Sequence, residues 1–163
     1  MNPAEIAAVQ AVMAALKDAE AGTELQLPDG SRARVEATPP GVRAVQVEQT
    51  DGKGWRLRVF EPGIDRPALY PANLPFIPGC KAAITDGSDG HIMATWETPE
   101  VDSVADQVTA QSTQEGWVPE PDDPAFARLP MPMQMRQFRR AERTRVIMRM
   151  NVGGAKMVSL FDT

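Results

Sequence analysis

Residues 95–117, TWETPEVDSVADQVTAQSTQEGW, decide the fold because they predict one helix with strand-like segments on both sides. Thr98 is a suitable N-cap, Pro99 suits the first helical position, and Gly116 suits the position just after a helix. An apolar stripe is formed by residues at three- and four-residue spacing, namely Val101, Val104, Ala105 and Val108. We therefore expect a helix over residues 99–115 that packs this stripe on one sheet.

Residues 1–62 predict a first helix and then a four-stranded meander. Pro3 is typical of a helix start and Gly22 of a helix end. Two turn sequences, PDGS at 28–31 and TDGKG at 50–54, separate runs in which apolar and polar residues alternate. Such alternation is typical of an antiparallel sheet with one solvated face.

The rest of the chain predicts a connector and a second lobe. Residues 61–78 contain five prolines among apolar side chains, which indicates an extended but ordered connector, placed at residues 63–78. Residues 79–163 predict the order ββαβββ, with a loop over residues 118–130. The expected fold class is α+β, with two helix-on-antiparallel-sheet lobes, αββββ then ββαβββ, packed together. The expected domains are residues 1–62, the connector and residues 79–163.

The second lobe resembles small bacterial domains of unknown function. The shared features are a Pro-aromatic-Pro-Gly start, PFIPGC at 75–80, a helix that ends in Gly116-Trp117, and QFRR at 137–140 before two final strands. The resemblance covers residues 74–163. It departs near residues 106–108, where those domains usually have an aromatic pair. The resemblance implies a fold and no activity.

The composition is that of a soluble globular protein, with 42% apolar and 24% charged residues in a chain of 163. Its first 21 residues have acidic side chains and no long apolar run, so we expect neither a secretory signal nor a membrane span. A single cysteine, Cys80, agrees with a reducing compartment. We expect a bacterial cytoplasmic protein without membrane contact, and the alternative is a mature exported chain.

Charge is distributed unevenly along the chain. The formal net charge is -5, yet residues 136–156 have seven bases and one acid, and the remainder has ten bases and 21 acids. The bases of this arginine row are Arg136, Arg139, Arg140, Arg143, Arg145, Arg149 and Lys156. Alternation along the strand puts Arg145 and Arg149 on one face, which we expect to be solvated. The row then pairs with acidic parts of the chain, binds an acidic protein, or binds nucleic acid. Nucleic acid is disfavoured by the acidic pI of about 4.9 and by a single nearby aromatic, Phe138.

Six of the nine methionines fall within residues 131–157, and they are Met131, Met133, Met135, Met148, Met150 and Met157. Alternation places Met131, Met133 and Met135 on one strand face, and Met148 and Met150 on one face of the next strand. Two interpretations stay open: a core beneath the helix, or a flexible apolar surface that accepts a partner. The expected partner-binding residues are Arg136, Arg139, Arg140, Arg145, Arg149, Met131 and Met133.

No catalytic residue, metal ligand or cofactor site is predicted. A nucleophilic dyad of Cys80 and His91 has no recognisable orienting group or oxyanion loop. The acids of DGSDG at 86–90 and of PDDP at 121–124 offer oxygens to a hard cation, but Asp-Gly pairs are ordinary turn residues. We favour turns.

The expected function is a noncatalytic protein-interaction module, such as an adaptor, a chaperone-like protein or an assembly subunit. Its partner is another protein, with an acidic surface, or a second copy in a homodimer that pairs through an exposed strand edge. The first alternative is an enzyme or small-molecule binder with a pocket between the lobes near Tyr70, Trp55 and His91. The second is nucleic-acid binding through the arginine row.

Overall fold

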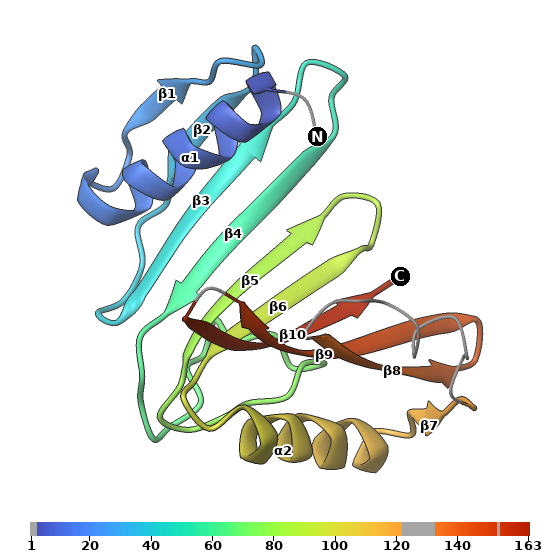
Figure 1. Ribbon diagram of the computed structural model, residues 1–163. Helices are drawn as coiled ribbons and strands as arrows, with labels where there is room; N and C mark the ends of the chain where they lie inside the picture. The colour runs from blue at the N-terminus through green and yellow to red at the C-terminus, as the bar shows by residue number, and fades with distance from the viewer. Residues whose placement is uncertain (1–2, 122–132, 153) are drawn as a thin grey trace. The chain divides into compact units, whose positions relative to one another are not determined.

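The computed structural model describes residues 3–121, 133–152 and 154–163. Within these residues, ten strands form one antiparallel sheet in the order β1-β2-β3-β4-β5-β6-β10-β9-β8-β7, accompanied by two helices (Figure 1). The elements are α1 (Pro3–Asp18), β1 (Glu24–Gln26), β2 (Arg32–Val35), β3 (Val42–Glu48), β4 (Gly54–Phe60), β5 (Lys81–Gly87), β6 (Ile92–Glu97), α2 (Val101–Gln114), β7 (Val118–Pro119), β8 (Met133–Arg140), β9 (Arg143–Val152) and β10 (Ala155–Asp162).

The expectation of two α+β lobes with separate sheets is wrong, because the sheet continues from β4 through β5 and β6. Left unpaired, β4 would be a seven-residue edge of exposed backbone donors and acceptors. The actual end strands are much shorter, with three residues in β1 and two in β7. The chain nevertheless divides into two compact units. The first unit is Met1–Phe60 with Ala83–His91, and the second unit is Glu61–Ala82 with Ile92–Thr163.

In the first unit, α1 packs on one face of β2 and β3. The helix contributes Ala8, Val12, Ala15 and Leu16 to the buried cluster, and the strands contribute Ala33, Val35, Val45, Val47, Leu57 and Val59. Just beyond the helix, Arg43 Nη2 donates a hydrogen bond of 2.8 Å to the Ala19 carbonyl. A cation there also suits the negative end of the helix dipole.

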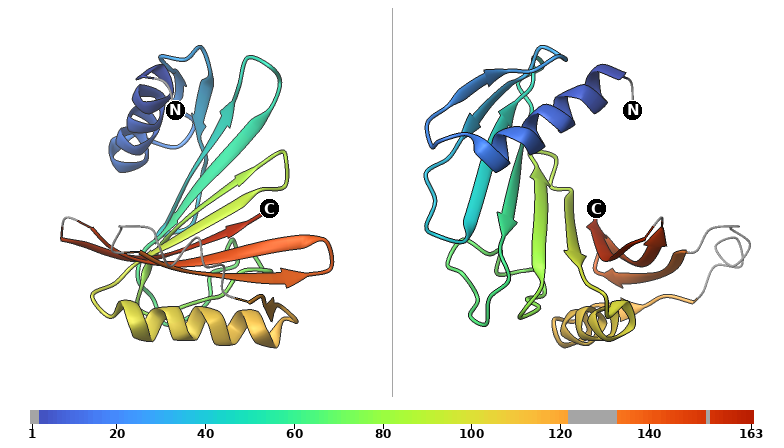
Figure 2. Two further views of the ribbon diagram at one scale, coloured as in Figure 1. Left: turned by 45° about the vertical axis from the view of Figure 1, so that its right-hand side comes forward. Right: turned by 60° about the vertical axis from the view of Figure 1, so that its left-hand side comes forward.

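In the second unit, α2 covers one face of β9 and β10 (Figure 2). Of its predicted stripe, Val104, Ala105 and Val108 are buried and Val101 is half-buried. The residues buried beneath it include Trp96, Phe138, Ile147, Val158 and Leu160. Strand register places these residues on one face, because Val158 pairs with Trp96 and Leu160 with Ile147.

The predicted helix is confirmed, but its start is two residues later than expected. Thr98 is not its N-cap, and its Oγ1 instead accepts the Glu100 N–H at 3.0 Å just before the first turn. Gly116 has the expected left-handed conformation, with φ of 93°. Trp117 then donates its backbone N–H to the Ser112 carbonyl at 3.1 Å, which closes a Schellman motif. This turn buries the Trp117 ring, which is 1% exposed.

The proline-rich connector is ordered within the second unit. A hydrogen bond of 2.9 Å from the Gly79 N–H to the Gly63 carbonyl closes it into a loop. The amide of Gln111 on α2 accepts from the Phe76 N–H at 2.9 Å and donates to the Phe76 carbonyl at 2.8 Å. One helix side chain therefore pairs with the connector as a neighbouring strand would.

We predict that Val104→Asp destabilises the second unit by at least about 3 kcal/mol, because Val104 is only 3% exposed and an aspartate there is a buried, unpaired charge. Urea unfolding measures the effect. The matched control is Ser103→Asp on the exposed side of α2, which should change stability by less than about 1 kcal/mol. Equal stability of the two variants would mean that the wrong helix face has been assigned to the core.

Candidate interaction site

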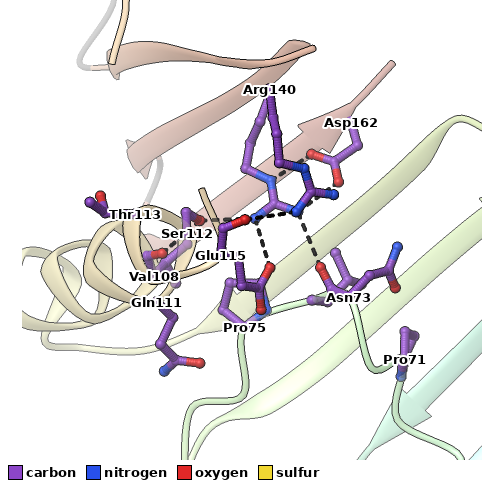
Figure 3. A network of polar contacts seen from close by, with 12 residues as sticks. Pro71, Asn73, Pro75, Val108, Gln111, Ser112, Thr113, Glu115, Arg140 and Asp162 are labelled. Carbon is purple, nitrogen blue, oxygen red and sulfur yellow. Dashed lines mark hydrogen bonds and ion pairs between the residues drawn. The ribbon is translucent and has the colours of Figure 1, made fainter. Parts of the chain in front are cut away.

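Arg145 lies at the centre of a buried polar network in the second unit. Its Nε and Nη2 each donate to the Asp162 carboxylate at 2.7 Å, its Nη1 donates to Ser112 Oγ at 2.9 Å, and its Nη2 donates to the Asn73 carbonyl at 3.3 Å. Figure 3 labels three of these partners, Asp162, Ser112 and Asn73. The guanidinium carbon also lies 4.3 Å from the centre of the Trp117 ring. Both charged side chains, Arg145 and Asp162, are 1% exposed.

The expectation that Arg145 faces solvent is therefore wrong. Strand alternation was assigned correctly, since Arg145 and Arg149 share a face of β9, but α2 packs on this face. Arg145 is tolerated there because a bidentate carboxylate and further acceptors replace its water. In this structure it cannot contact a partner.

The other arginines of the row also find partners within the chain. Arg149 bridges Asp102 at 2.6 Å and Asp106 at 3.2 Å, two exposed acids on α2. Arg139 pairs with Glu120 at 2.7 Å.

Two further members of the row lie over aromatic rings. Arg140 donates to the Glu115 carbonyl at 3.0 Å and lies 4.7 Å from the Trp117 ring centre. Arg136 lies 5.8 Å from the ring centre of Phe138. Asp102 and Asp106 of α2, Glu120 after β7 and Asp162 of β10 therefore pair with several cations of the arginine row.

Met135, Met148, Met150 and Met157 lie on the face of the sheet opposite α2. Met148 and Met150 alternate with Ile147 and Arg149 on β9, so they point away from the helix. The interpretation of these methionines as a core beneath α2 is therefore wrong. Met131 lies outside the described residues, and only the backbone of Met133 is described, within β8.

We name this surface the methionine face. Cross-strand pairing aligns Met157 of β10 with Met150 of β9, and Met148 of β9 with Met135 of β8. The half-buried or exposed apolar members are Met93, Met135, Val146, Met148, Met150, Met157 and Phe161. Met93 and Phe161 were not predicted to join it, because their place depends on the pairing of β6 with β10, which local alternation does not reveal.

Cys80 and His91 do not form a dyad. Cys80 precedes β5, whereas the His91 carbonyl accepts a hydrogen bond from Gly87 at the far end of the same strand. Burial raises the pKa of the Cys80 thiol, which favours its protonated, less nucleophilic form.

The DGSDG segment forms a hairpin turn. Asp86 pairs with Arg58 at 3.1 Å, and Asp89 Oδ1 accepts the His91 backbone N–H at 3.0 Å. Across the part of the chain that is described, no three or more His, Cys, Asp or Glu side chains cluster as metal ligands. Asp122 and Asp123 lie outside that part.

The three residues expected to line a pocket, Tyr70, Trp55 and His91, each have contacts within their own unit. Tyr70 is buried in the second unit and its hydroxyl donates to the Pro75 carbonyl. In the first unit, Trp55 packs against the apolar cluster and His91 is exposed beside Asp89.

A hollow of about 820 Å³ lies beside the start of α2, with Glu100, Asp102, Arg149 and Lys156 in its lining. Most of its lining residues are polar, and charges of both signs are present. Pockets for small molecules are predominantly apolar with a few polar groups. This hollow therefore gives little support to the small-molecule alternative.

Comparison with known proteins adds no assignment, since no protein-family model, curated protein or solved structure matches the chain. The resemblance to small bacterial domains stays a prediction. Neither of the helices in the described residues has the length and apolar character needed to cross a membrane.

We predict that Arg145→Ser costs about 3 to 5 kcal/mol of stability, because it leaves the Asp162 carboxylate buried without its partner. Arg149→Ser is the matched control and should cost about 0 to 1 kcal/mol, because its ion pairs are exposed. Urea unfolding of both variants measures the difference. A loss below 1 kcal/mol for Arg145→Ser would contradict the buried network.

A second prediction concerns pH. Burial raises the pKa of Tyr70 to about 12, whereas an unfolded tyrosine has a pKa of about 10. Stability from the neutral phenol is therefore fully present below pH 10 and is lost as the pH rises to 12, by about 2 to 3 kcal/mol. Unfolding free energies at several pH values should show this loss. Tyr70→Phe should be less stable at neutral pH but should lose less between pH 10 and 12, and identical slopes would contradict the assignment.

Proposed function

We propose that the protein is a noncatalytic protein-interaction module that binds its partner through the methionine face. The observation that carries the proposal is an apolar sheet surface with no helix packed on it within the described residues. Methionine suits such a surface, because its flexible, polarisable side chain adapts to different apolar partners.

The size of the methionine face favours a helix as the partner element. Four strands about 4.8 Å apart, with about six residues along each at about 3.4 Å, give a face of roughly 15 to 20 Å on each side. That area is less than half of the roughly 800 Å² per partner buried in a standard stable interface. It matches one amphipathic helix of about three turns, which spans about 17 Å. Helix-on-sheet packing is also the arrangement made by α1 and by α2.

The alternatives have less support. The ion pairs of Arg139, Arg145 and Arg149 leave fewer cations for nucleic acid or for an acidic partner surface. A homodimer through a strand edge would use β1 or β7, which have three and two residues, or the part of β8 that β7 does not pair. An enzymatic role would need convergent catalytic groups, and Cys80 and His91 do not meet.

The test is a pull-down from the native host with matched variants. The double variant Met148→Gln/Met150→Gln should lose the partner that the wild type captures, because polar groups replace half-buried thioethers. The control Ile64→Gln changes an apolar residue that is 86% exposed in the connector, and it should keep the partner. Circular dichroism checks that both variants are folded.

Arg136→Ser/Arg149→Ser, two changes on the face of the sheet opposite the methionines, tests the arginine alternative in the same experiment. Loss of the partner in this variant, with retention in the methionine variant, would overturn the assignment of the face. A partner captured equally by all variants would do the same.

A further inference from the structure

We propose that the methionine face contains a binding site for a soft monovalent metal ion, Cu(I), held by the thioether sulfurs of Met135, Met148, Met150 and Met157. Soft thioether and thiolate ligands select Cu(I), whereas carboxylates and carbonyls suit magnesium and calcium. These four residues are a different ligand set from the cysteine, histidine and carboxylate clusters considered from the sequence. The inference does not depend on partner binding.

The way methionine is used in this chain is the first argument. The buried apolar residues of the described chain are Ala, Val, Leu, Ile, Phe, Tyr and Trp, with no Met among them. The methionines Met135, Met148, Met150 and Met157 are instead half-buried on a single sheet face. Filling a core does not explain this placement, whereas a metal ion arriving from solvent needs reachable sulfurs.

Strand register supplies the geometry. Met150 pairs directly with Met157, and Met148 pairs directly with Met135. Directly opposed residues have Cβ atoms about 4.5 to 5.5 Å apart, and Met148 and Met150 are two residues, or about 7 Å, apart along one strand. Each methionine has three rotatable side-chain bonds, so sulfurs from this spacing can converge on one point. The Met150 Sδ lies 3.7 Å from Ser159 Oγ and is therefore directed toward β10, the strand that also contains Met157.

Charge on this face also suits a cation. Glu97, an exposed carboxylate, pairs with Met157 and therefore lies at the end of the row Glu97-Met157-Met150. Arg145, Arg149 and Lys156 alternate with the methionines and lie on the opposite face. Arg139 shares the methionine face at its far end, where Glu120 pairs with it. Thioethers carry no proton, so binding should not depend on the deprotonation that thiol or imidazole ligands require.

The experiment titrates Cu(I) into the purified chain under anaerobic conditions, in competition with a chromophoric Cu(I) chelator. Cys80 is itself a soft ligand, so the parent protein is Cys80→Ser. We expect one equivalent of Cu(I) to be withdrawn from the chelator. The melting temperature should rise with Cu(I) and not with Zn(II), since an ion that binds the native state stabilises it.

Spectra of the protein labelled at the methionine methyl groups locate the ion. The methyl signals of Met135, Met148, Met150 and Met157 should shift with Cu(I), and that of Met13, which is 50% exposed on α1, should not. No withdrawal of Cu(I) by the parent, or shifts spread equally to Met13, would overturn the proposal.

Leucine variants test the ligands with little change in volume. Met148→Leu/Met150→Leu should weaken Cu(I) binding at least tenfold, and the control Met13→Leu should leave it unchanged. Met157→Leu, on a different strand, serves if the double variant is unfolded, and it should also weaken binding. Unchanged affinity in a folded leucine variant of the face would contradict the site.

Discussion

The second unit depends on the buried ion pair between Arg145 and Asp162. A guanidinium loses much solvation when it is buried, and here the carboxylate, the Ser112 hydroxyl and the Asn73 carbonyl replace its water. These acceptors come from β10, α2 and the connector. Apolar contacts are non-directional, whereas the bonds of one planar side chain also fix the orientation of these three segments.

The same interaction determines which face of the sheet remains open. In a strand, successive side chains point to opposite faces, so the burial of Arg145 beneath α2 commits Ile147 and Arg149 to that face as well. Met148 and Met150 must then point away from the helix. The buried Arg145 and the uncovered methionines are therefore two results of one strand register, and a shift of one residue would exchange the two faces of β9.

Much of the secondary structure could be predicted because local signals carry it. The stripe Val104, Ala105 and Val108 and the left-handed Gly116 both behave as their spacing indicates. The pairing of β5 with β4 could not be predicted, because hairpin signals identify neighbours in sequence and do not show which hairpins share a sheet. The sequence also did not reveal which face of the sheet α2 covers, for a related reason. On a strand with arginine on one side and methionine on the other, the methionine side is the one expected to face the protein interior. The arginine side is buried instead because Asp162, 17 residues away, pairs with Arg145.

The place of β10 within the sheet has a consequence for the order of folding. This strand lies between β6 and β9, so a strand from near the end of the chain separates two strands made before it. During synthesis β6 has no neighbour on that side until residues about 60 positions later have left the ribosome. The β9–β10 hairpin can form locally, but its docking on β6 closes a long loop and comes late. Chaperones that shield unpaired strands would therefore act on the second unit for longer than on the first, whose β1–β4 meander pairs in chain order.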